Sequence, residues 1–489
     1  MGRIVQDKLD LATISKRVVR GALSLTFRRV ALQAISFITI NLVLARILSV
    51  STLGVFNIGT AIISFFVFFA DIGLAAALIQ KKESITTEDL KTTFTIQQIL
   101  VVSLAVATWL TAPFLAQLYG LDNSGVWLIR ALSLSFAVTS FKVIPSIILE
   151  RELKFSPLVW VEILETLVFN IGLIVLVLYG FGLTAFSISA VARALIGAVA
   201  IYIIAPWKIG LGISYLSAQG LLKFGVPYQL NSILALLKDR LVPLVIARMV
   251  GPLGIGYITW AQNLAFLPLE VMNIVIRVSF PALSRLQEDK KALKSTLEKS
   301  LFLTTLFLYP MLFGMLALAP SLVEHVVSSK WAQALPAFYL FSISTFWATL
   351  STTFTNTLNA IGQIRTTLKL MIFWTLLTWI LTPVLTYYFG FIGVAISSSL
   401  ISLTSVITII LIKRFVNVAI LENIWSPLLA SIAMGGCLFY LSSMFVKDLT
   451  SLIIMIAIGG IIYWSLIMVL AKAKLKDVLG EIKYAFSSK

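Results

Sequence analysis

Nine charged side chains within long apolar stretches of this chain are the candidates for chemistry because of their types and positions. A charge buried in an apolar segment is costly and therefore usually serves a function. The set holds six cations and three carboxylates: Arg130, Lys142, Arg193, Lys238, Arg240 and Arg277, with Asp71, Asp239 and Glu270. Guanidinium and ammonium groups bind phosphate oxygens well, so this excess of positive charge favours an anionic substrate.

Five of the cations are expected to line a water-filled cavity that binds the substrate. They are Lys142, Arg193, Lys238, Arg240 and Arg277. The adjacent triplet Lys238-Asp239-Arg240 is the preferred location for substrate contact, because it puts three charges into one apolar run. The alternative is that pairs such as Asp239 with Arg193 are buried ion pairs that only fix helix packing.

The three carboxylates Asp71, Asp239 and Glu270 are candidates for ion coupling. A desolvated carboxylate binds a proton more readily, so each could carry a proton or bind Na⁺. The membrane potential is a rival source of energy, because it acts on any net charge that moves with the substrate. No cofactor is expected in either case.

Two arginines recur in similar surroundings and are candidate gate residues. Arg46 follows Leu-Val-Leu-Ala, and Arg248 follows Leu-Val-Ile-Ala. At the ends of their helices they could instead extend toward the interface and complement the helix dipole. Four uncharged polar residues could contact sugar hydroxyls, although hydrogen bonds between helices explain them equally well. These four are Asn41, Asn231, Thr353 and Asn356.

The composition requires a lipid environment for most of the chain. Of 489 residues, 59% are hydrophobic and 12% are charged, with a mean hydropathy of +1.00. The net charge of +17 is spread over short loops, which argues against nucleic-acid binding. With one cysteine and one histidine, Cys437 and His325, a disulfide framework or a metal site is not expected. The sequence thus indicates a polytopic membrane protein without a metal.

The elements that must position the charged residues are predicted to be helices of membrane-spanning length, about 20 residues each. Fourteen such stretches occur: 28–48, 54–79, 93–118, 126–149, 159–179, 184–206, 221–250, 254–282, 298–319, 335–361, 367–389, 392–412, 424–446 and 449–471. Lys and Arg are concentrated in alternate connections and at both ends, which predicts that both termini are cytoplasmic. The basic N-terminal segment 1–27 is expected to include an interfacial helix.

An internal repeat predicts two bundles of six helices. The Leu-Val-x-Ala-Arg pattern recurs after 202 residues, and Gly180-Phe181-Gly182 recurs as Gly390-Phe391-Ile392-Gly393 after 210. Six is even, so the two copies share one orientation in the membrane. The predicted organisation is an N-terminal bundle, a cytoplasmic linker, a C-terminal bundle, two additional helices and a basic tail: 28–206, 207–220, 221–414, 424–471 and 472–489.

Several runs resemble one known family. They are FADIGLAAALIQK at 69–81, ERELKF at 150–155, the stretch 239–254, YITWAQNL at 257–264, FPALSRLQ at 280–287, and Lys330-Trp331. The chain resembles, over residues 20–415, the Wzx-type flippases of the multidrug/oligosaccharidyl-lipid/polysaccharide exporter superfamily, in the colanic-acid and teichuronic-acid exporter branch. The resemblance implies a fold like that of the MATE transporters and lipid flippases.

The same resemblance implies a substrate and a location. The protein would move undecaprenyl-pyrophosphate-linked oligosaccharide across the bacterial plasma membrane by alternating access, for surface polysaccharide synthesis. Membrane lipids and the polymerase and chain-length machinery would be its partners. A cation-coupled drug antiporter of the same superfamily is the alternative, although it would need an acidic cavity. A glycan polymerase is a further alternative, but the short connections on the outer side leave little room for an enzyme's acceptor site.

Overall fold

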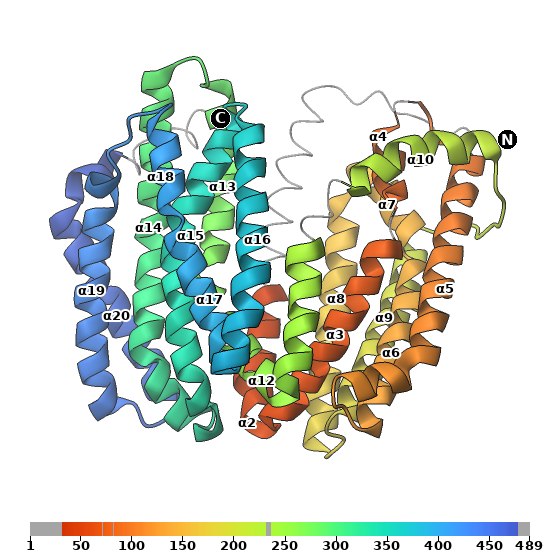
Figure 1. The fold of residues 1–489 in the computed structure, drawn as a ribbon, viewed down its shortest axis with the longest axis horizontal. Helices are drawn as coiled ribbons and strands as arrows, with labels where there is room; N and C mark the ends of the chain where they lie inside the picture. Colours follow the sequence, from red (N-terminus) through yellow and green to blue (C-terminus); the bar gives the residue numbers. More distant parts are fainter. Residues whose placement is uncertain (1–31, 71, 82, 231–235, 478–489) are drawn as a thin grey trace. The chain divides into compact units, whose positions relative to one another are not determined.

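Figure 1 shows the computed structural model, which describes residues 32–70, 72–81, 83–230 and 236–477. Within these ranges the chain forms helices and no strand. Eleven of the described helices are long and apolar enough to cross a membrane. The pair α6 (Asn123–Ser140) and α7 (Val143–Arg151), bent by 43°, makes a twelfth if it is one broken span. The prediction of an all-α polytopic membrane protein is therefore confirmed. The predicted interfacial helix in 1–27, Asp71 and Asn231 lie outside the described residues.

The chain divides into two compact units, Met1–Gly256 and Tyr257–Lys489, which are described separately. The first unit holds a π-helical segment η1, helices α2 to α10, a second π-helical segment η2 and the start of α12. Their bounds are η1 Ile38–Leu44, α2 Ala45–Ile47, α3 Val50–Ala70, α4 Leu74–Gln80, α5 Thr87–Leu118, α6 Asn123–Ser140, α7 Val143–Arg151, α8 Phe155–Leu178, α9 Thr184–Ile204, α10 Tyr215–Leu230, η2 Leu237–Leu241 and α12 Val242–Phe266.

Local sequence explains where several of these helices begin. Thr86 accepts a hydrogen bond from the Asp89 amide and Asp89 accepts one from the Thr86 amide, which forms a capping box at the start of α5. Asp122 caps α6 by accepting a hydrogen bond from the amide of Gly125. These caps satisfy amides that have no partner within their own helix.

Glycines interrupt the helices at two places. Gly73 has φ +79° and separates α3 from α4, so the predicted span 54–79 is two helices rather than one. Gly251 has φ +66° and interrupts α12 where the predicted spans 221–250 and 254–282 meet. A positive φ is favourable only for glycine, so these two residues set the places of the breaks.

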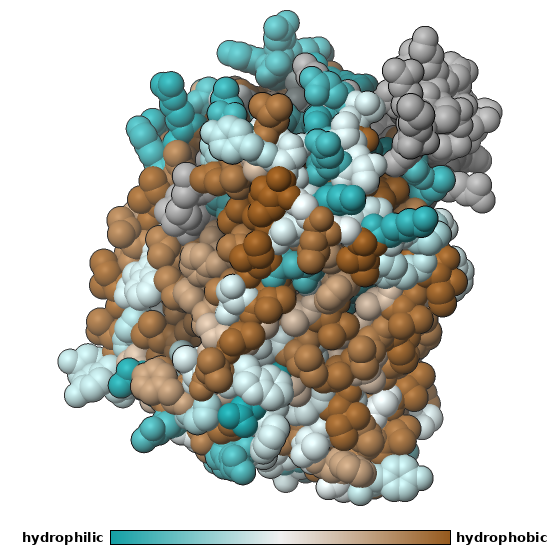
Figure 2. All heavy atoms as spheres, turned by 90° about the vertical axis from the view of Figure 1, so that its right-hand side faces the viewer, coloured by the Kyte–Doolittle hydropathy of each residue, from teal (hydrophilic) through white to brown (hydrophobic). Residues whose placement is uncertain are grey.

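An exposed apolar stripe runs along α5. Ile99, Val102, Val106, Leu110 and Phe114 recur at three- and four-residue spacing, and each has a largely exposed side chain. This spacing puts them on one side of the helix. Figure 2, which views the molecule from the α5 side, shows hydrophobic side chains over most of this face and hydrophilic ones gathered toward its upper end and at its lower left. Such a surface suits lipid rather than water.

The predicted linker 207–220 belongs to the first unit and is attached to α5. The amide of Gly212 donates a hydrogen bond to Thr95 Oγ1 at 2.9 Å, and the amide of Ser214 donates to Thr92 Oγ1 at 3.0 Å. The compact units divide after Gly256, within α12, and not at this linker. The linker therefore packs as part of the first unit, and the predicted bundle boundaries remain a prediction.

The second unit contains the end of α12 and the helices that follow it. Their bounds are α13 Leu269–Arg285, α14 Lys290–Ser321, η3 Leu322–Val327, η4 Ser329–Ala334, α15 Leu335–Ala360, α16 Ile364–Phe389, α17 Phe391–Leu403, α18 Val406–Lys413, α19 Ile420–Phe445 and α20 Leu449–Leu470. Trp331 is fully buried and stacks on Trp260 with ring centroids 5.1 Å apart. Helix α19 packs on both α14 and α20, and Tyr463 of α20 donates a hydrogen bond to the Leu306 carbonyl at 2.6 Å.

Candidate functional site

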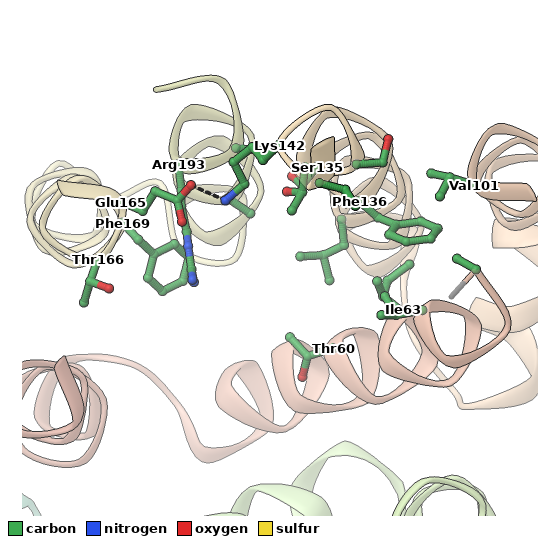
Figure 3. A pocket seen from close by; sticks show the side chains of 18 of the residues that line it. Thr60, Ile63, Val101, Ser135, Phe136, Lys142, Glu165, Thr166, Phe169 and Arg193 are labelled. Carbon is green, nitrogen blue, oxygen red and sulfur yellow. Dashed lines mark hydrogen bonds and ion pairs between the residues drawn. The ribbon is translucent and has the colours of Figure 1, made fainter. Parts of the chain in front are cut away.

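A cavity of about 630 Å³ lies inside the first unit. Side chains from near and within η1 and from α3, α5, α6, α7, α8 and α9 surround it (Figure 3). Its apolar lining includes Phe56, Ile63, Val101, Leu132, Phe136 and Phe169, and its polar lining consists of Ser36, Thr60, Gln97, Ser135, Thr139, Ser140, Lys142, Glu165, Thr166, Asn170 and Arg193. The polar groups therefore lie in a partly open pocket between helices, one of which, α5, carries an apolar outer face.

Lys142 and Glu165 form an ion pair at the wall of this cavity (Figure 3). Lys142 lies at the bend between α6 and α7, where it is the N-cap residue of α7, and its side chain extends to the Glu165 carboxylate on α8. The lysine side chain is 18% exposed and the glutamate side chain is 4% exposed. A carboxylate buried to this degree is tolerated only with a charged or hydrogen-bonding partner, which Lys142 provides.

Glycine at position 197 makes room for this carboxylate. A Cβ atom at Gly197 of α9 would stand 1.6 Å from Glu165 Oε1, far inside any allowed contact. The helices α8 and α9 thus approach closely at Glu165 because α9 has no side chain there. The position of the buried charge is set by backbone packing as well as by its cation.

Arg193 enters the same cavity from α9, one helical turn before Gly197. Its guanidinium carbon lies 5.8 Å from the ring centroid of Phe169, which is one turn along α8 from Glu165. Arginine favours such a stacked position because its planar group is weakly hydrated. Arg193 is exposed to the cavity, and no carboxylate pairs with it among the residues that the structure describes.

Neutral polar groups complete the lining. Asn170 is buried and donates a hydrogen bond to the Thr166 carbonyl at 2.7 Å, while its Oδ1 atom has no partner within the described part of the chain. Gln98 Nε2 lies 2.9 Å from Ser140 Oγ, which fixes the hydroxyl of a lining residue. The cavity therefore offers two cations, one carboxylate and several groups able to bind hydroxyls.

The structure brings together two of the five predicted cavity cations. Lys142 and Arg193 line this cavity, whereas Lys238, Arg240 and Arg277 are absent from its lining. Lys238, Asp239 and Arg240 are exposed on η2, and Arg277 is exposed on α13. Their roles remain predictions.

The remaining candidate residues lie elsewhere. Arg46 and Arg248 are exposed near the ends of α2 and of the first part of α12. Burial raises the pKa of the Tyr119 phenol just beyond α5, and the nearby charge of Arg248 opposes that rise. Glu270 is half-buried in the first turn of α13.

The predicted sugar contacts in the described residues all bond to their own helices. Asn41 Nδ2 donates to the Phe37 carbonyl, Thr353 Oγ1 to Thr349, and Asn356 Nδ2 to Thr352, each four residues back. Asn41 and Thr353 are also buried. Each local bond uses one donor of its side chain, and the part of these residues in sugar binding stays a prediction.

Glu165 is the site residue that the sequence reasoning missed. It lies inside the predicted span 159–179, six residues after its start, and so carried the same signal that identified Lys142 and Arg193. Among the described residues no group of three or more His, Cys, Asp or Glu side chains is placed to hold a metal.

Comparisons with known proteins point to one family. The family model described as "Polysaccharide biosynthesis protein" matches residues 43–336. The lipopolysaccharide biosynthesis protein WzxC of Escherichia coli is 29% identical over 308 residues, which cover 62% of this chain and 61% of WzxC. The succinoglycan biosynthesis transport protein ExoT of Rhizobium meliloti is 24% identical over 460 residues, which cover 91% of each chain.

One solved structure has a similar fold over nearly the whole chain. The lipid II flippase MurJ, in an inward closed conformation, superposes with a TM-score of 0.72 and 16% sequence identity. The superposition covers 94% of this chain and 100% of the MurJ chain. The expected likeness to lipid flippases is thereby confirmed for the fold.

Proposed function

This chain belongs to the polysaccharide biosynthesis protein family, and we propose that it is the flippase that moves a lipid-linked oligosaccharide across the membrane. The observation that carries the proposal is the cavity of about 630 Å³ in the first unit, with Lys142 and Arg193 in its lining. The resemblance to MurJ in fold and to ExoT over 91% of both chains supports a transport role. The proposed substrate is an undecaprenyl-pyrophosphate-linked oligosaccharide.

The cavity chemistry fits the polar part of such a substrate. Pyrophosphate oxygens are negatively charged, and Arg193 can donate two hydrogen bonds to them from one planar group. Hydroxyl and amide groups such as Thr166 and Asn170 suit sugar hydroxyls. The lipid tail needs no polar site, because it stays within the hydrocarbon of the bilayer.

A drug antiporter is less consistent with this lining. A cationic drug requires an acidic cavity, whereas the described lining has two cations and one carboxylate, a formal balance of +1. A glycan polymerase would need residues arranged for bond formation, and transport requires only binding and a change of access. A flippase therefore fits the lining of the cavity better than a drug antiporter or a glycan polymerase does.

The finer architecture is also part of the proposal. We infer fourteen spans in two six-helix bundles with two further helices, 424–471, and cytoplasmic ends on a bacterial plasma membrane. The break at Gly251 supports two spans within the region that includes α12, and the described helix within 32–47 supports a first span there. Transport is proposed to be driven by a proton gradient, by an Na⁺ gradient or by the membrane potential. Polysaccharide polymerase and chain-length proteins are the proposed partners.

The decisive experiment replaces the cavity arginine. Arg193→Gln is expected to reduce surface polysaccharide by at least about tenfold in cells that depend on this protein, since one charged contact is worth roughly 1.5–3 kcal/mol. Lipid-linked oligosaccharide should accumulate on the cytoplasmic leaflet. Surface glycan and lipid-linked intermediate are both measured after mild acid release and mass spectrometry.

The matched control is Arg365→Gln, which removes an exposed arginine from the first turn of α16, outside the cavity. Protein level and monodispersity must match the wild type in both variants. Normal export by Arg193→Gln at normal protein level would contradict the assignment of this cavity to the substrate.

A further inference from the structure

Lys142 and Glu165 are held in very different ways, and this difference carries an inference about how the cavity selects anions. Glu165 projects from the middle of α8 and is fixed against the bare backbone of α9 at Gly197. Lys142 stands at the α6–α7 bend, where a four-carbon stem carries its charge. Lysine stems reorient easily, so the ammonium is the mobile partner of the pair and the carboxylate is the fixed one.

Arg193 lies beside this pair but is positioned by an aromatic ring rather than by an acid. The Arg193 guanidinium packs on the Phe169 ring. The nearby carboxylate of Glu165 is already neutralised by Lys142. Among the described residues that line the cavity, Arg193 has no paired carboxylate, whereas Lys142 is bound to Glu165 (Figure 3).

We propose that Glu165 is an internal counter-ion whose place at Lys142 is taken by the substrate's phosphate oxygens, and that this exchange selects anions with two or more negative charges. This inference rests on the proposed function. An entering pyrophosphate contacts Arg193 first and then draws the Lys142 ammonium away from Glu165. No covalent bond forms or breaks in the exchange.

The selection of multivalent anions follows from the free-energy cost of detaching Lys142 from Glu165. An anion with a single charge is attracted by Arg193 alone, because detaching Lys142 would leave a buried carboxylate without its cation. A pyrophosphate supplies a second charge, which binds Lys142 and offsets that cost. Carriers must also release what they bind, and a competing carboxylate that recaptures Lys142 weakens the bound state enough to allow release.

The test compares two anions on purified protein in neutral phosphatidylcholine nanodiscs. Inorganic pyrophosphate is the multivalent probe and dimethyl phosphate is the monovalent probe, with affinities measured by calorimetry. The wild type should prefer pyrophosphate. Glu165→Gln should bind dimethyl phosphate about tenfold more tightly, since Lys142 is then free to bind a monovalent anion. The ratio of the pyrophosphate affinity to the dimethyl phosphate affinity should therefore fall.

Two further variants keep the test informative if Glu165→Gln folds poorly. Gly197→Ala retains every charge but displaces the Glu165 carboxylate. It should therefore lower the ratio of the pyrophosphate affinity to the dimethyl phosphate affinity, as Glu165→Gln does. Gly436→Ala, at a helical glycine with open space around its Cβ position, is the matched control and should leave both affinities unchanged.

The outcomes separate this inference from the proposed function. If Glu165→Gln and Gly197→Ala leave the ratio of the two affinities unchanged while Arg193→Gln weakens pyrophosphate binding, the counter-ion role is wrong and the transport site stands. If Arg193→Gln changes neither pyrophosphate binding nor export, the site itself is wrong. If the wild-type protein binds no pyrophosphate, both are overturned.

Discussion

Gly54 of α3 packs directly against Pro252 of α12, so that a Cβ atom on Gly54 would stand 1.7 Å from the Pro252 carbonyl oxygen. The reverse contact exists as well, because a Cβ atom on Gly256 would stand 2.3 Å from the Val50 carbonyl oxygen. Gly54 follows Arg46 by the same eight residues that separate Gly256 from Arg248. A two-fold-related repeat would produce such a reciprocal contact, and small residues allow helix backbones to approach this closely.

Alanine at these two glycines should destabilise the protein. Gly54→Ala and Gly256→Ala each place a methyl group against backbone, which cannot move as a side chain can, and overpacking of this kind costs about 1–3 kcal/mol. The loss is measured as a lower unfolding temperature in detergent by fluorescence-detected size exclusion. Gly460→Ala, which meets nothing within 4 Å, serves as the control. Equal unfolding temperatures for all three variants would contradict the close crossing.

The ion pair of Lys142 and Glu165 should show strong coupling in stability. Lys142→Met leaves a buried carboxylate unpaired and should cost about 3–5 kcal/mol. The double variant Lys142→Met/Glu165→Gln should lose less than Lys142→Met alone, since no uncompensated charge remains. The two single variants, the double variant and the wild type form a mutant cycle in denaturant unfolding. Simple additivity of the two single losses would show that the pair does not interact.

The attachment of segment 208–214 to α5 can be tested at single amides. Thr92→Val removes the acceptor of the Ser214 amide and Thr95→Val that of the Gly212 amide. Each lost hydrogen bond is worth about 1 kcal/mol, so exchange of the corresponding amide should quicken by roughly fivefold in hydrogen–deuterium exchange mass spectrometry. Thr111→Val is the control, because the Thr111 hydroxyl bonds only within its own helix. Unaltered exchange in both variants would exclude this anchoring.

The cap of α6 predicts a dependence of stability on pH. The Ser124 hydroxyl and the Gly125 amide donate hydrogen bonds to Asp122, and together they lower the pKa of that carboxyl below its usual value. A lowered pKa means that the ionised cap stabilises the fold above the ordinary pKa, and that this stability is lost as the pH falls through and below about 4.

Asp122→Asn keeps a capping side chain without the charge, so it isolates this effect. The wild type should unfold at a higher temperature than Asp122→Asn near pH 7, and the difference should disappear near pH 3. A difference that is constant over this range would mean that the charge of Asp122 does not contribute.

The sequence was sufficient to predict the helical class, most of the spans and the family. Apolar runs of spanning length are a direct signal, because backbone groups in lipid must be satisfied within a helix. The break at Gly251 falls between the predicted spans 221–250 and 254–282, whereas the break at Gly73 was less accessible, since a glycine in an apolar run is compatible with both a continuous and a broken helix. Their positive φ values appear only when the backbone is built.

The site was predictable only in part, for a geometric reason. Lys142 and Arg193 were identified as intramembrane cations, but their common cavity depends on how α6, α8 and α9 are rotated and packed, which residue spacing along one helix does not determine. Glu165 was overlooked although it carried the same signal. Lys238, Asp239 and Arg240 are adjacent in the sequence, yet none of them lines the cavity of the first unit. Adjacent charges in a sequence therefore do not by themselves identify a cavity.

Gly197 shows that the electric field in this cavity depends on the size of the uncharged residues beside the ionised groups as well as on the charges themselves. A methyl group at that position would move an acid away from its cation without altering a single ionisable residue. Two chains with identical inventories of lysine, arginine and acid could therefore differ in the anions they accept. Specificity in such carriers has to be compared through the small residues that face the charges, not through formal charge alone.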